Sequence, residues 1–358
     1  MTTDGAAPGD GGLGDRDNGI PRRLLVTGAG GPAAVAFMQA VDQSADVHAI
    51  CWAVDIDPCA AGLYLVPQDR RSLVPRGDDP GFADAVLDRC RTERIDVLVP
   101  TVDSELLPVA RRLDDFAGLG VAVLSPSPDT LERCLDKWAL LQGCGPDVPI
   151  PRGGLLDDGF DPASSGWASL GWPRLVKPRR GSGSRGIRLI DDQAAFDRLA
   201  RDGTLLVQEY LPGPEYSVDT LAYRDGHVAA AVPRSRLKVD SGISVAGCTV
   251  DRADLVEAAK AVARSVGLTS VANIQFREDA AGTPRLLEVN PRFPGTMPLT
   301  VASGVNMPAL AVADLLGQPV PREVPFRPVA MVRHWAQTFL PVDEFEATGP
   351  PLPLGLPS

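Results

Sequence analysis

The first third of the chain alternates short, continuously apolar runs with segments of helical periodicity. The run from Arg22 ends in a glycine turn at Gly28, and apolar side chains then recur at helical spacing. The order repeats, with predicted strands at 22–28, 47–55, 95–100 and 121–124 and predicted helices at 33–41, 81–92 and 104–113. Apolar strands that alternate with helices are typical of a doubly wound α/β domain, whose parallel sheet is covered on both faces.

The pattern changes after residue 128. Asp129 to Glu132 predicts a capping box that opens a helix to about residue 142, and 143–171 is rich in glycine, proline and aspartate. Later strands are predicted at 174–177, 186–190, 205–209, 216–223, 227–232, 271–276 and 285–289, with helices at 192–201, 253–266 and 307–316. This order predicts an α+β domain with many antiparallel pairings.

These patterns divide the chain into four parts. Residues 1–20 lack periodicity and contain six glycines and four aspartates, which predicts a disordered arm. We assign 21–126 to the doubly wound domain and 127–325 to the α+β domain. The remainder, 326–358, is a C-terminal extension that is rich in proline from residue 341.

Composition and charge narrow the classes of function. Of the 358 residues, 44% are apolar and 23% charged, as in globular proteins, and the net charge of −11 disfavours broad binding to nucleic acid or anionic membranes. We see no secretory signal at the start and no apolar run of 18 residues. The six cysteines form no C-x-x-C pair and histidines number three, so we expect a reduced, cytoplasmic protein without a structural zinc site.

Two glycine-rich turns have the composition of phosphate-binding loops. Gly28 to Ala33 fits G-x-G-x-x-A after a strand, with Asp55 further on, and indicates either a dinucleotide site or an ordinary tight turn. Residues 174–187 (RLVKPRRGSGSRGI) form a strand, a basic loop and a second strand, where small residues let backbone amides approach phosphate. The alternative interpretation of this second loop is an exposed basic hairpin.

A third segment, 206–216 (LVQEYLPGPEY), carries a strand that ends in Glu-Tyr-Leu. The free backbone groups of a terminating strand could bind a planar heterocycle, and Glu215 beyond the Pro-Gly-Pro turn could accept hydrogen bonds from a ribose. The alternative is an ordinary turn with solvated glutamates.

A fourth element combines three oxygen donors. Gln275, Glu288 and Asn290 alternate with apolar residues along two predicted strands, so their side chains face one side. Such a set suits Mg²⁺, and Arg292 follows within reach of a phosphoryl group. The alternative is a sheet face whose polar side chains bond one another.

In their order and spacing these motifs resemble the ATP-grasp superfamily, in the branch with the carbamoyl-phosphate synthetase domains and the amino-acid ligases. The motifs are VKPRRGSGSRGI, QEYLPGPEYSVD, NIQF and LLEVNPRFPG. The resemblance covers about 22–320 and implies an ATP-grasp fold, with a Rossmann-like pre-ATP-grasp domain that binds no NAD. It further implies a lid subdomain at about 140–212 and a metal-binding subdomain at about 213–325.

The resemblance implies a role for each matching residue. Those matching nucleotide-binding positions are Lys137, Lys177, Ser182, Gly183, Ser184, Gly186, Glu209, Tyr210, Leu211 and Glu215. Those matching Mg²⁺ ligands are Gln275, Glu288 and Asn290, with Mn²⁺ as a substitute. The cations expected at the reacting groups are Arg292, Lys177 and Arg236. Many family members carry an acid where this chain has Gln275, and Gln occurs in the carbamoyl-phosphate branch.

The implied reaction is ATP-dependent carboxylate–amine ligation through an acyl phosphate, with ADP and phosphate as products. An amino acid is the first choice of substrate, and a homodimer is left open. The alternatives are an enzyme that phosphorylates bicarbonate or a very small acid, and a non-catalytic nucleotide-binding protein. Further substrate contacts are assigned to Arg236 and Lys238, to 293–306, and to Asp103 and Glu105; for these last two, solvated acids at a helix start are the favoured alternative.

Overall fold

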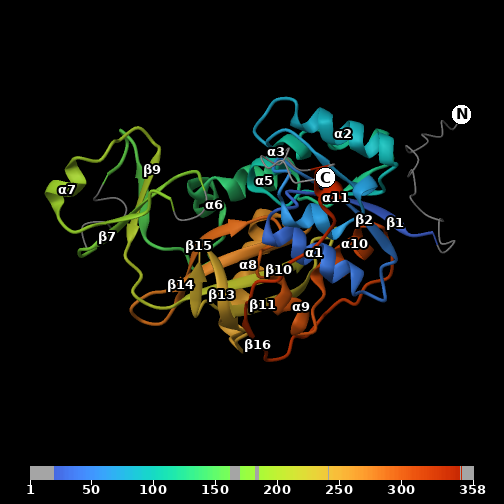
Figure 1. The fold of residues 1–358 in the computed structure, drawn as a ribbon. Helices are drawn as coiled ribbons and strands as arrows, with labels where there is room; N and C mark the ends of the chain where they lie inside the picture. Colours follow the sequence, from blue (N-terminus) through green and yellow to red (C-terminus); the bar gives the residue numbers. More distant parts are fainter. Residues whose placement is uncertain (1–19, 162–169, 182–184, 241, 347, 349–358) are drawn as a thin grey trace, which may run out of the picture.

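The described residues form three β-sheets of four or five strands and one sheet of three strands (Figure 1). A computed structural model describes residues 20–161, 170–181, 185–240, 242–346 and 348. The predicted disordered arm, apart from Ile20, and the loop residues Ser182, Gly183 and Ser184 lie outside the described residues.

The N-terminal domain has the predicted parallel sheet, with strand order β3-β2-β1-β4-β5. Its strands are β1 (Arg22–Thr27), β2 (Ala49–Asp55), β3 (Arg71–Leu73), β4 (Val97–Val99) and β5 (Ala122–Val123). Its helices are α1 (Pro32–Asp42), α2 (Phe82–Glu93), α3 (Asp103–Ala110) and α4 (Leu113–Gly118), with 3-10 turns η1 (Ala61–Leu65) and η2 (Gln68–Arg70). Leu24 and Val26 pack towards α1 while Leu25 packs towards α2, so helices cover both faces.

The lid is a small antiparallel sheet at one end of the molecule, far from the N-terminal domain (Figure 1). It contains β6 (Gly153–Leu156), β7 (Arg174–Pro178), β8 (Arg188–Ile190) and β9 (Leu205–Glu209), in the order β6-β9-β7-β8, together with α7 (Gln193–Asp197). Phe196 of α7 is buried against Val176 and Val207, which gives the lid its own apolar core.

The central sheet is antiparallel, in the order β11-β10-β14-β15. Its strands are β10 (Glu215–Ala222), β11 (Val228–Ser235), β14 (Val271–Glu278) and β15 (Pro284–Asn290). One face carries Val218, Ile274 and Val289 and packs against α8 (Ala253–Val266), α5 (Pro128–Leu135) and α6 (Lys137–Gly143). The other face is apolar at Leu221, Val232 and Val271, which belong to the core shared with the N-terminal domain. It is polar around Asn273, Gln275 and Glu288, and this polar part forms the floor of the candidate site.

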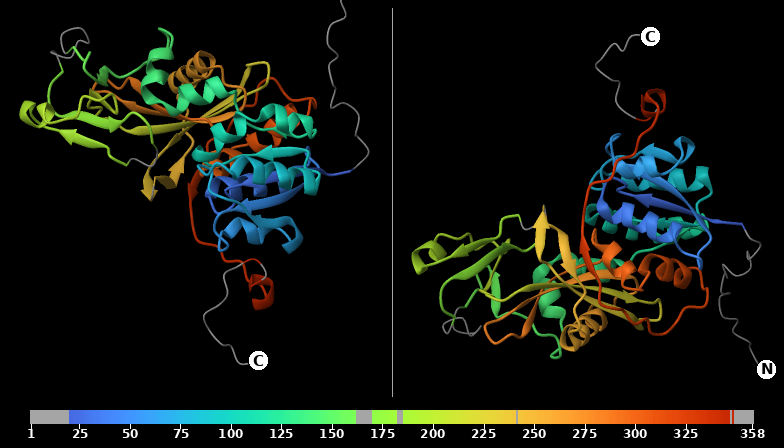
Figure 2. Two further views of the ribbon diagram at one scale, coloured as in Figure 1. Left: turned by 90° about the horizontal axis from the view of Figure 1, so that it is seen from above. Right: turned by 60° about the horizontal axis from the view of Figure 1, so that its bottom comes forward.

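Helices α9 (Met297–Ala302) and α10 (Met307–Leu315) pack directly on α1 of the N-terminal domain. The two parts therefore share one apolar core, in which Phe37 of α1 meets Phe293 edge-on at 5.0 Å between ring centroids. A three-stranded sheet of β12 (Lys238–Asp240), β13 (Ile243–Cys248) and β16 (Ala330–Val332) flanks the central sheet. From β16 the chain runs past the N-terminal domain to α11 (Val342–Glu346), as Figure 2 shows.

The structure corrects the single helix predicted to residue 142. It is two helices, α5 and α6, that are separated at Asp136. Asp136 has an extended backbone and its carboxylate accepts the amide protons of Trp138 and Ala139, so it begins a new helix instead of continuing the first. The predicted capping box at Asp129 is also wrong, because Ser127 caps α5 by accepting the Thr130 amide.

Candidate active site

The larger pocket, of about 400 Å³, lies between the lid and the central sheet. Its walls come from β7, β9 and the loop after β7 on one side and from β14 and β15 on the other. It is lined by Lys137, Leu175, Lys177, Pro178, Arg180, Gly181, Arg185, Ile187, Gln208, Glu209, Tyr210, Leu211, Glu215, Gln275, Arg277, Leu287 and Glu288. The structure thus brings together the predicted nucleotide-binding residues that it describes, except Gly186.

Two lysines from different elements converge on β15 inside this pocket. The ammonium of Lys177, on β7, donates to the carbonyl of Leu287 at 3.0 Å, and burial lowers its pKa to about 8 despite the nearby carboxylate of Glu288. The ammonium of Lys137, at the start of α6, donates to the carbonyl of Gly181 and lies 3.8 Å from Glu288. Two buried cations beside one carboxylate suit a polyanion with a bound metal.

The two predicted nucleotide acids already have protein partners. Arg152 donates from its backbone amide and its guanidinium to both oxygens of Glu209, at 2.8 and 2.9 Å. Glu215 lies 3.1 Å from Nε of Arg236. The Glu209 backbone amide in turn donates to the carbonyl of Arg152 at 2.9 Å, so the two residues are bonded through both main chain and side chain.

Gln208 is a pocket residue that we did not single out from the sequence. Its side chain is 2% exposed, lines the larger pocket, and has an amide nitrogen without a hydrogen-bond partner. A buried donor is normally hydrogen-bonded, and this one faces the larger pocket, where a ligand with an acceptor group would match it. The signal in the sequence was a polar residue inside an apolar strand, directly before Glu209.

The glycine loop is tied to the junction of α5 and α6. The Asp136 carboxylate accepts hydrogen bonds from Arg179 at 2.8 Å and Arg180 at 2.9 Å. Burial acts to raise the pKa of Asp136, but these bonds and that from Ala139 outweigh it and hold the pKa below its usual value. Gly186 has a φ of +74°, and a Cβ there would lie 2.8 Å from Pro178, so a larger residue does not fit.

The polar face of the central sheet carries the candidate metal ligands. Gln275 pairs with Glu288 across β14 and β15, and Asn273 pairs with Asn290 two residues further along the two strands. The Asn290 amide donates to Glu288 at 3.2 Å. Among the described residues no three His, Cys, Asp or Glu side chains are placed to hold a metal ion, so amide oxygens would complete the set. One carboxylate and two amides on one face fit Mg²⁺ with phosphate and water as its other ligands.

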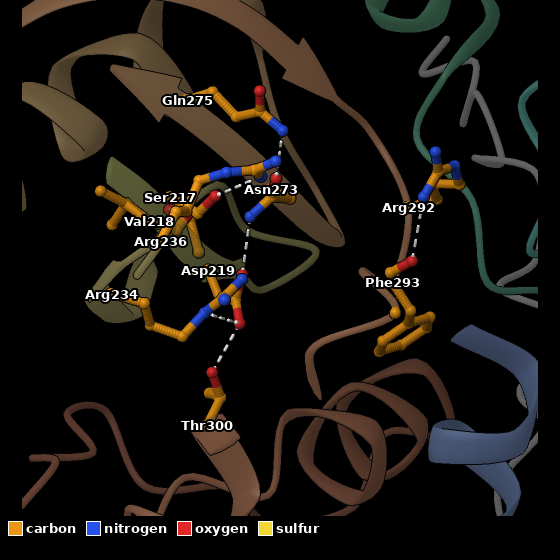
Figure 3. A network of polar contacts seen from close by, with 12 residues as sticks. Ser217, Val218, Asp219, Arg234, Arg236, Asn273, Gln275, Arg292, Phe293 and Thr300 are labelled. Atoms are coloured by element: carbon orange, nitrogen blue, oxygen red, sulfur yellow. Dashed lines mark hydrogen bonds and ion pairs between the residues drawn. The ribbon is translucent and has the colours of Figure 1, made fainter. Parts of the chain in front are cut away.

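A buried network under this face was missed by sequence reasoning (Figure 3). Asp219, on β10, accepts two bonds from Arg234 at 2.6 and 2.9 Å, one from Asn273 at 2.8 Å and one from Thr300 at 2.5 Å. Asn273 in turn accepts the amide of Gln275 at 3.1 Å. The network fixes the Gln275 carboxamide, and its sequence signal was the alternation of polar and apolar residues along β10.

The smaller pocket, of about 230 Å³, opens on the same polar face. It is lined by Glu215, Arg236, Gly242, Ile243, Ser244, Asn273, Gln275, Glu288, Asn290, Arg292, Pro294, Gly295 and Thr296. Arg236 also donates to the carbonyl of Gly242 at 3.1 Å, which holds the β12–β13 hairpin over the pocket. Of the predicted substrate segments, Arg236 and the start of 293–306 are here, whereas exposed Lys238 does not line the pocket.

The structure tests three predictions at the carboxyl edge of the N-terminal sheet: the roles of Asp103, of Glu105 and of the first glycine turn. Asp103 binds Arg292, with 2.6 Å to its Nε and 3.0 Å to its Nη2. Glu105 is 5% exposed, so a solvated acid is the wrong interpretation; burial raises its pKa to about 7, opposed by the hydrogen bond from Thr27. The first glycine turn closes on the protein itself, because Asp55 accepts the Gly30 amide at 2.7 Å.

Two family descriptions match the chain. Residues 24–124 match "PylC-like, N-terminal domain". Residues 201–338 match "ATP-grasp in the biosynthetic pathway with Ter operon".

Curated relatives match a part of their own length. The arginine-specific carbamoyl phosphate synthase large chain of Geobacillus stearothermophilus is 26% identical over 258 residues, which is 67% of this chain and 24% of that protein. The carbamoyl phosphate synthase large chain of Kineococcus radiotolerans is 30% identical over 220 residues, which is 55% of this chain and 19% of that protein. The chain therefore spans about a quarter of these relatives or less.

Solved structures with the same fold include the following three. Biotin carboxylase of Campylobacter jejuni, in complex with β-γ-ATP, aligns with a TM-score of 0.66 at 17% identity, over 85% of this chain and 72% of that one. The biotin carboxylase domain dimer of Hydrogenobacter thermophilus 2-oxoglutarate carboxylase, with MgADP and bicarbonate, aligns with a TM-score of 0.66 at 17% identity, over 84% of this chain and 70% of that one. L-Amino acid ligase of Bacillus licheniformis aligns with 0.59 at 18%, over 82% and 74%.

No helix in the described ranges is both long and apolar enough to cross a membrane. The matches to both parts of the chain agree with the two-part fold and with a pocket between lid and central sheet. The chain therefore carries an ATP-grasp domain that includes residues 201–338, behind a PylC-like N-terminal domain over 24–124.

Proposed function

We propose that this protein is an ATP-dependent carboxylate–amine ligase that works through an acyl phosphate. One observation carries the proposal: the larger and smaller pockets share Glu215, Gln275 and Glu288 as a common wall. A nucleotide in the larger pocket and an acid in the smaller one would meet over β14 and β15. The relatives named carbamoyl phosphate synthase and the structural likeness to an L-amino acid ligase support this class of reaction.

The proposed chemistry has two steps. A carboxylate oxygen of the acid attacks the γ-phosphorus of ATP, the bond to the bridging oxygen breaks, and ADP leaves with that electron pair. An amine nitrogen then attacks the acyl carbon, inorganic phosphate leaves, and the amine loses a proton. Neither step needs a nucleophile from the protein, so the residues of the chain act by positioning groups and neutralising charge.

Each residue has a part in this scheme. Lys137 and Lys177 bind the phosphates from the side of α6 and β7, and Arg292 and Arg236 stabilise negative charge in the smaller pocket. Gln275, Glu288 and Asn290 would hold Mg²⁺, or Mn²⁺ in its place. When bound, the metal neutralises phosphate charge.

A second candidate reaction is the phosphorylation of bicarbonate. It is favoured by the relatives named carbamoyl phosphate synthase and by the small, polar pocket with two arginines. Bicarbonate would occupy the place of the larger acid, and its product would not persist as a hydroxamate.

A hydroxylamine trap separates these functions. The protein, MgATP and hydroxylamine are incubated with panels of carboxylates and amino acids, and ADP and hydroxamate are measured. ADP with a matching hydroxamate supports the ligase and names its acid; ADP stimulated by bicarbonate alone supports the second candidate. MgADP binding without ADP release on any acid would contradict both.

Variants tie the activity to the site. Arg292→Ala and Glu288→Ala should each retain less than a tenth of the wild-type rate, because removing a group that stabilises the transition state costs about 3 kcal/mol or more. Glu257→Ala, whose carboxylate pairs with Lys260 on the surface of α8, is the matched control and should keep the full rate. Light scattering tests whether the protein is a homodimer, as described for the Hydrogenobacter domain.

A further inference from the structure

An ion pair joins the N-terminal domain to the smaller pocket. Asp103 is the first residue of α3, and its two carboxylate oxygens lie 2.6 Å from Nε and 3.0 Å from Nη2 of Arg292. The residues are 189 positions apart in the sequence, and each side chain is about one-fifth exposed. A bidentate carboxylate–guanidinium pair fixes the plane of the guanidinium as well as its distance.

The Asp103 end of this pair is held in place by the fold. Two residues further along α3, the Glu105 carboxylate accepts the hydroxyl of Thr27 at 2.5 Å and the amide of Val102 at 3.3 Å. Gly77 packs closely against the Glu105 side chain, because a Cβ at position 77 would lie 2.7 Å from Glu105. The first turn of α3 is therefore locked to the carboxyl end of β1.

The Arg292 end is held by a bond to the next residue in the sequence, which itself packs on the N-terminal domain. Its Nη1 donates to the carbonyl of Phe293 at 3.3 Å, as Figure 3 shows, and the Phe293 ring packs on Phe37 of α1. A guanidinium has five N–H donors. Asp103 and Phe293 use three of them, on Nε, Nη2 and Nη1. Within the part of the chain that the structure describes, the other two N–H groups have no acceptor, and they belong to a residue that lines the smaller pocket.

We propose that Asp103 is a positioning residue for Arg292, supplied by the N-terminal domain to the reaction over the central sheet. By holding the Nε and Nη2 edge, it aims the free N–H groups of Arg292 at the anion in the smaller pocket. Without it, this long side chain would populate several rotamers and meet the reacting groups in the right orientation only part of the time. The inference rests on the proposed function.

The test compares three variants. Asp103→Asn keeps the size but removes the charge and one acceptor, and Asp103→Glu keeps the charge. Glu344→Gln is the matched control, because it removes the ion pair from α11 to Arg71 that also links the N-terminal domain to a distant segment. For each we measure kcat and KM in the hydroxylamine assay, MgADP affinity by calorimetry, Tm, and the crystal structure with MgADP.

We expect Asp103→Asn to lower kcat 10- to 100-fold, with KM for ATP and MgADP affinity within twofold of wild type. Asp103→Glu should recover part of kcat, Glu344→Gln should keep it, and the Arg292 guanidinium should leave its place in the Asp103→Asn crystal. An unmoved Arg292, an unchanged kcat, or equal losses in kcat and MgADP affinity would overturn the proposal. A wild-type protein that binds MgADP but turns over no acid would contradict the proposed function, while the position of Arg292 still decides the inference.

Discussion

Lys177 illustrates at the residue scale how a binding group can oppose folding. Its ammonium is buried, and its pKa of about 8 lies below the ordinary 10.5 because burial disfavours the charge. The charged lysine therefore lowers the stability of the folded protein, and under the proposed function the phosphates of ATP would offset this charge. At this single side chain, the charge that favours binding of an anion lowers the stability of the ligand-free protein.

Replacing Lys177 with Met should stabilise the ligand-free protein and weaken nucleotide binding. We expect Tm to rise by roughly 2–4 °C at pH 7, the shift for about 1 kcal/mol in a domain of this size, and MgADP affinity to fall at least tenfold. Between pH 8 and 10.5 the unfolded chain keeps a proton that the folded chain has lost, so the wild type gains stability as pH rises and the variant lacks this gain. Scanning calorimetry at pH 7 and 9.5 measures the difference in Tm and its dependence on pH. Equal pH profiles for the wild type and the variant would contradict the lowered pKa of Lys177.

Gln208→Leu tests whether the unpaired amide reads the nucleotide base. The variant removes the donor at similar size, and we expect about tenfold weaker MgADP binding, as for a lost buried hydrogen bond. The second ligand is 7-deaza-ADP, which lacks the ring acceptor N7. In calorimetry the wild type should bind it more weakly than ADP, whereas Gln208→Leu should bind the two ligands with nearly equal affinity. Gln193→Leu, on the exposed start of α7, is the control. Unchanged MgADP affinity in Gln208→Leu would show that the amide does not contact the base.

Individual residues were predictable where chemistry and alternation agreed. Gln275, Glu288 and Asn290 lie on one face because strand periodicity places them there. The pairing of Glu209 with Arg152 was not predictable, since Arg152 lies 57 residues earlier, directly before β6. Likewise the pairing of Asp103 with Arg292 depends on how two parts of the chain pack, which no local pattern encodes.

At the scale of elements, α3 shows how a helix start can respond to pH. Its first turn holds Glu105 buried against Thr27, and burial raises the pKa of this carboxyl to about 7. The folded state therefore binds a proton that the unfolded state has lost between pH 4.5 and 7. Stability is present at the acidic end of this window and declines as pH rises through it.

Glu105→Gln should remove this pH dependence. The amide keeps a hydrogen-bonding group in place without a charge, so we expect the fall in Tm between pH 5 and pH 7.5 to be smaller than in the wild type by a few degrees. Asp88→Asn, on the exposed face of α2, should leave the wild-type profile unchanged. Identical profiles for wild type and Glu105→Gln would mean that Glu105 does not titrate in this range.

Elements were predictable where periodicity was long, as in α8, whose observed bounds match the predicted 253–266. Short or interrupted elements were not. At the break, Asp136 caps α6 locally, and its carboxylate is also held by Arg179 and Arg180, which lie more than 40 residues later. The strand β16 forms only because β13 lies beside it, and nothing in its own three residues indicates a strand.

At the scale of the whole molecule, the fit between the two parts depends on the absence of a side chain at Gly295. A Cβ there would lie 2.8 Å from Pro32, the first residue of α1. Pro32 is rigid and begins a helix that is buried on both sides. The N-terminal domain and the wall of the smaller pocket therefore approach each other more closely than any other residue type permits.

Gly295→Ala should separate the parts slightly and affect both stability and turnover. We expect a loss of about 1–3 kcal/mol, the usual cost of overpacking, together with a lower kcat because the pocket wall moves. Gly118→Ala in α4, where an added Cβ meets nothing, is the control and should be neutral or stabilising. Calorimetry and the hydroxylamine assay measure the two effects, and a Gly295→Ala protein with wild-type Tm would contradict the close fit.

The overall architecture was predictable because four motifs stood in the order of a known superfamily and the N-terminal runs were those of a parallel sheet. The match to the ATP-grasp family over 201–338 confirms that recognition. The contact of α1 with α9 and α10 was not predictable, because sequence patterns describe the faces of helices but not which faces meet.

The wall common to the two pockets has a thermodynamic consequence. Since Glu215, Gln275 and Glu288 border both, a ligand on one side alters the charge and freedom of groups that the other side uses. Any change that nucleotide makes in the affinity for the acid must then be matched, factor for factor, by the change that the acid makes in the affinity for nucleotide. Reciprocity of this kind links the saturation curves of the two substrates, so that measuring one at several fixed levels of the other determines the coupling from either side.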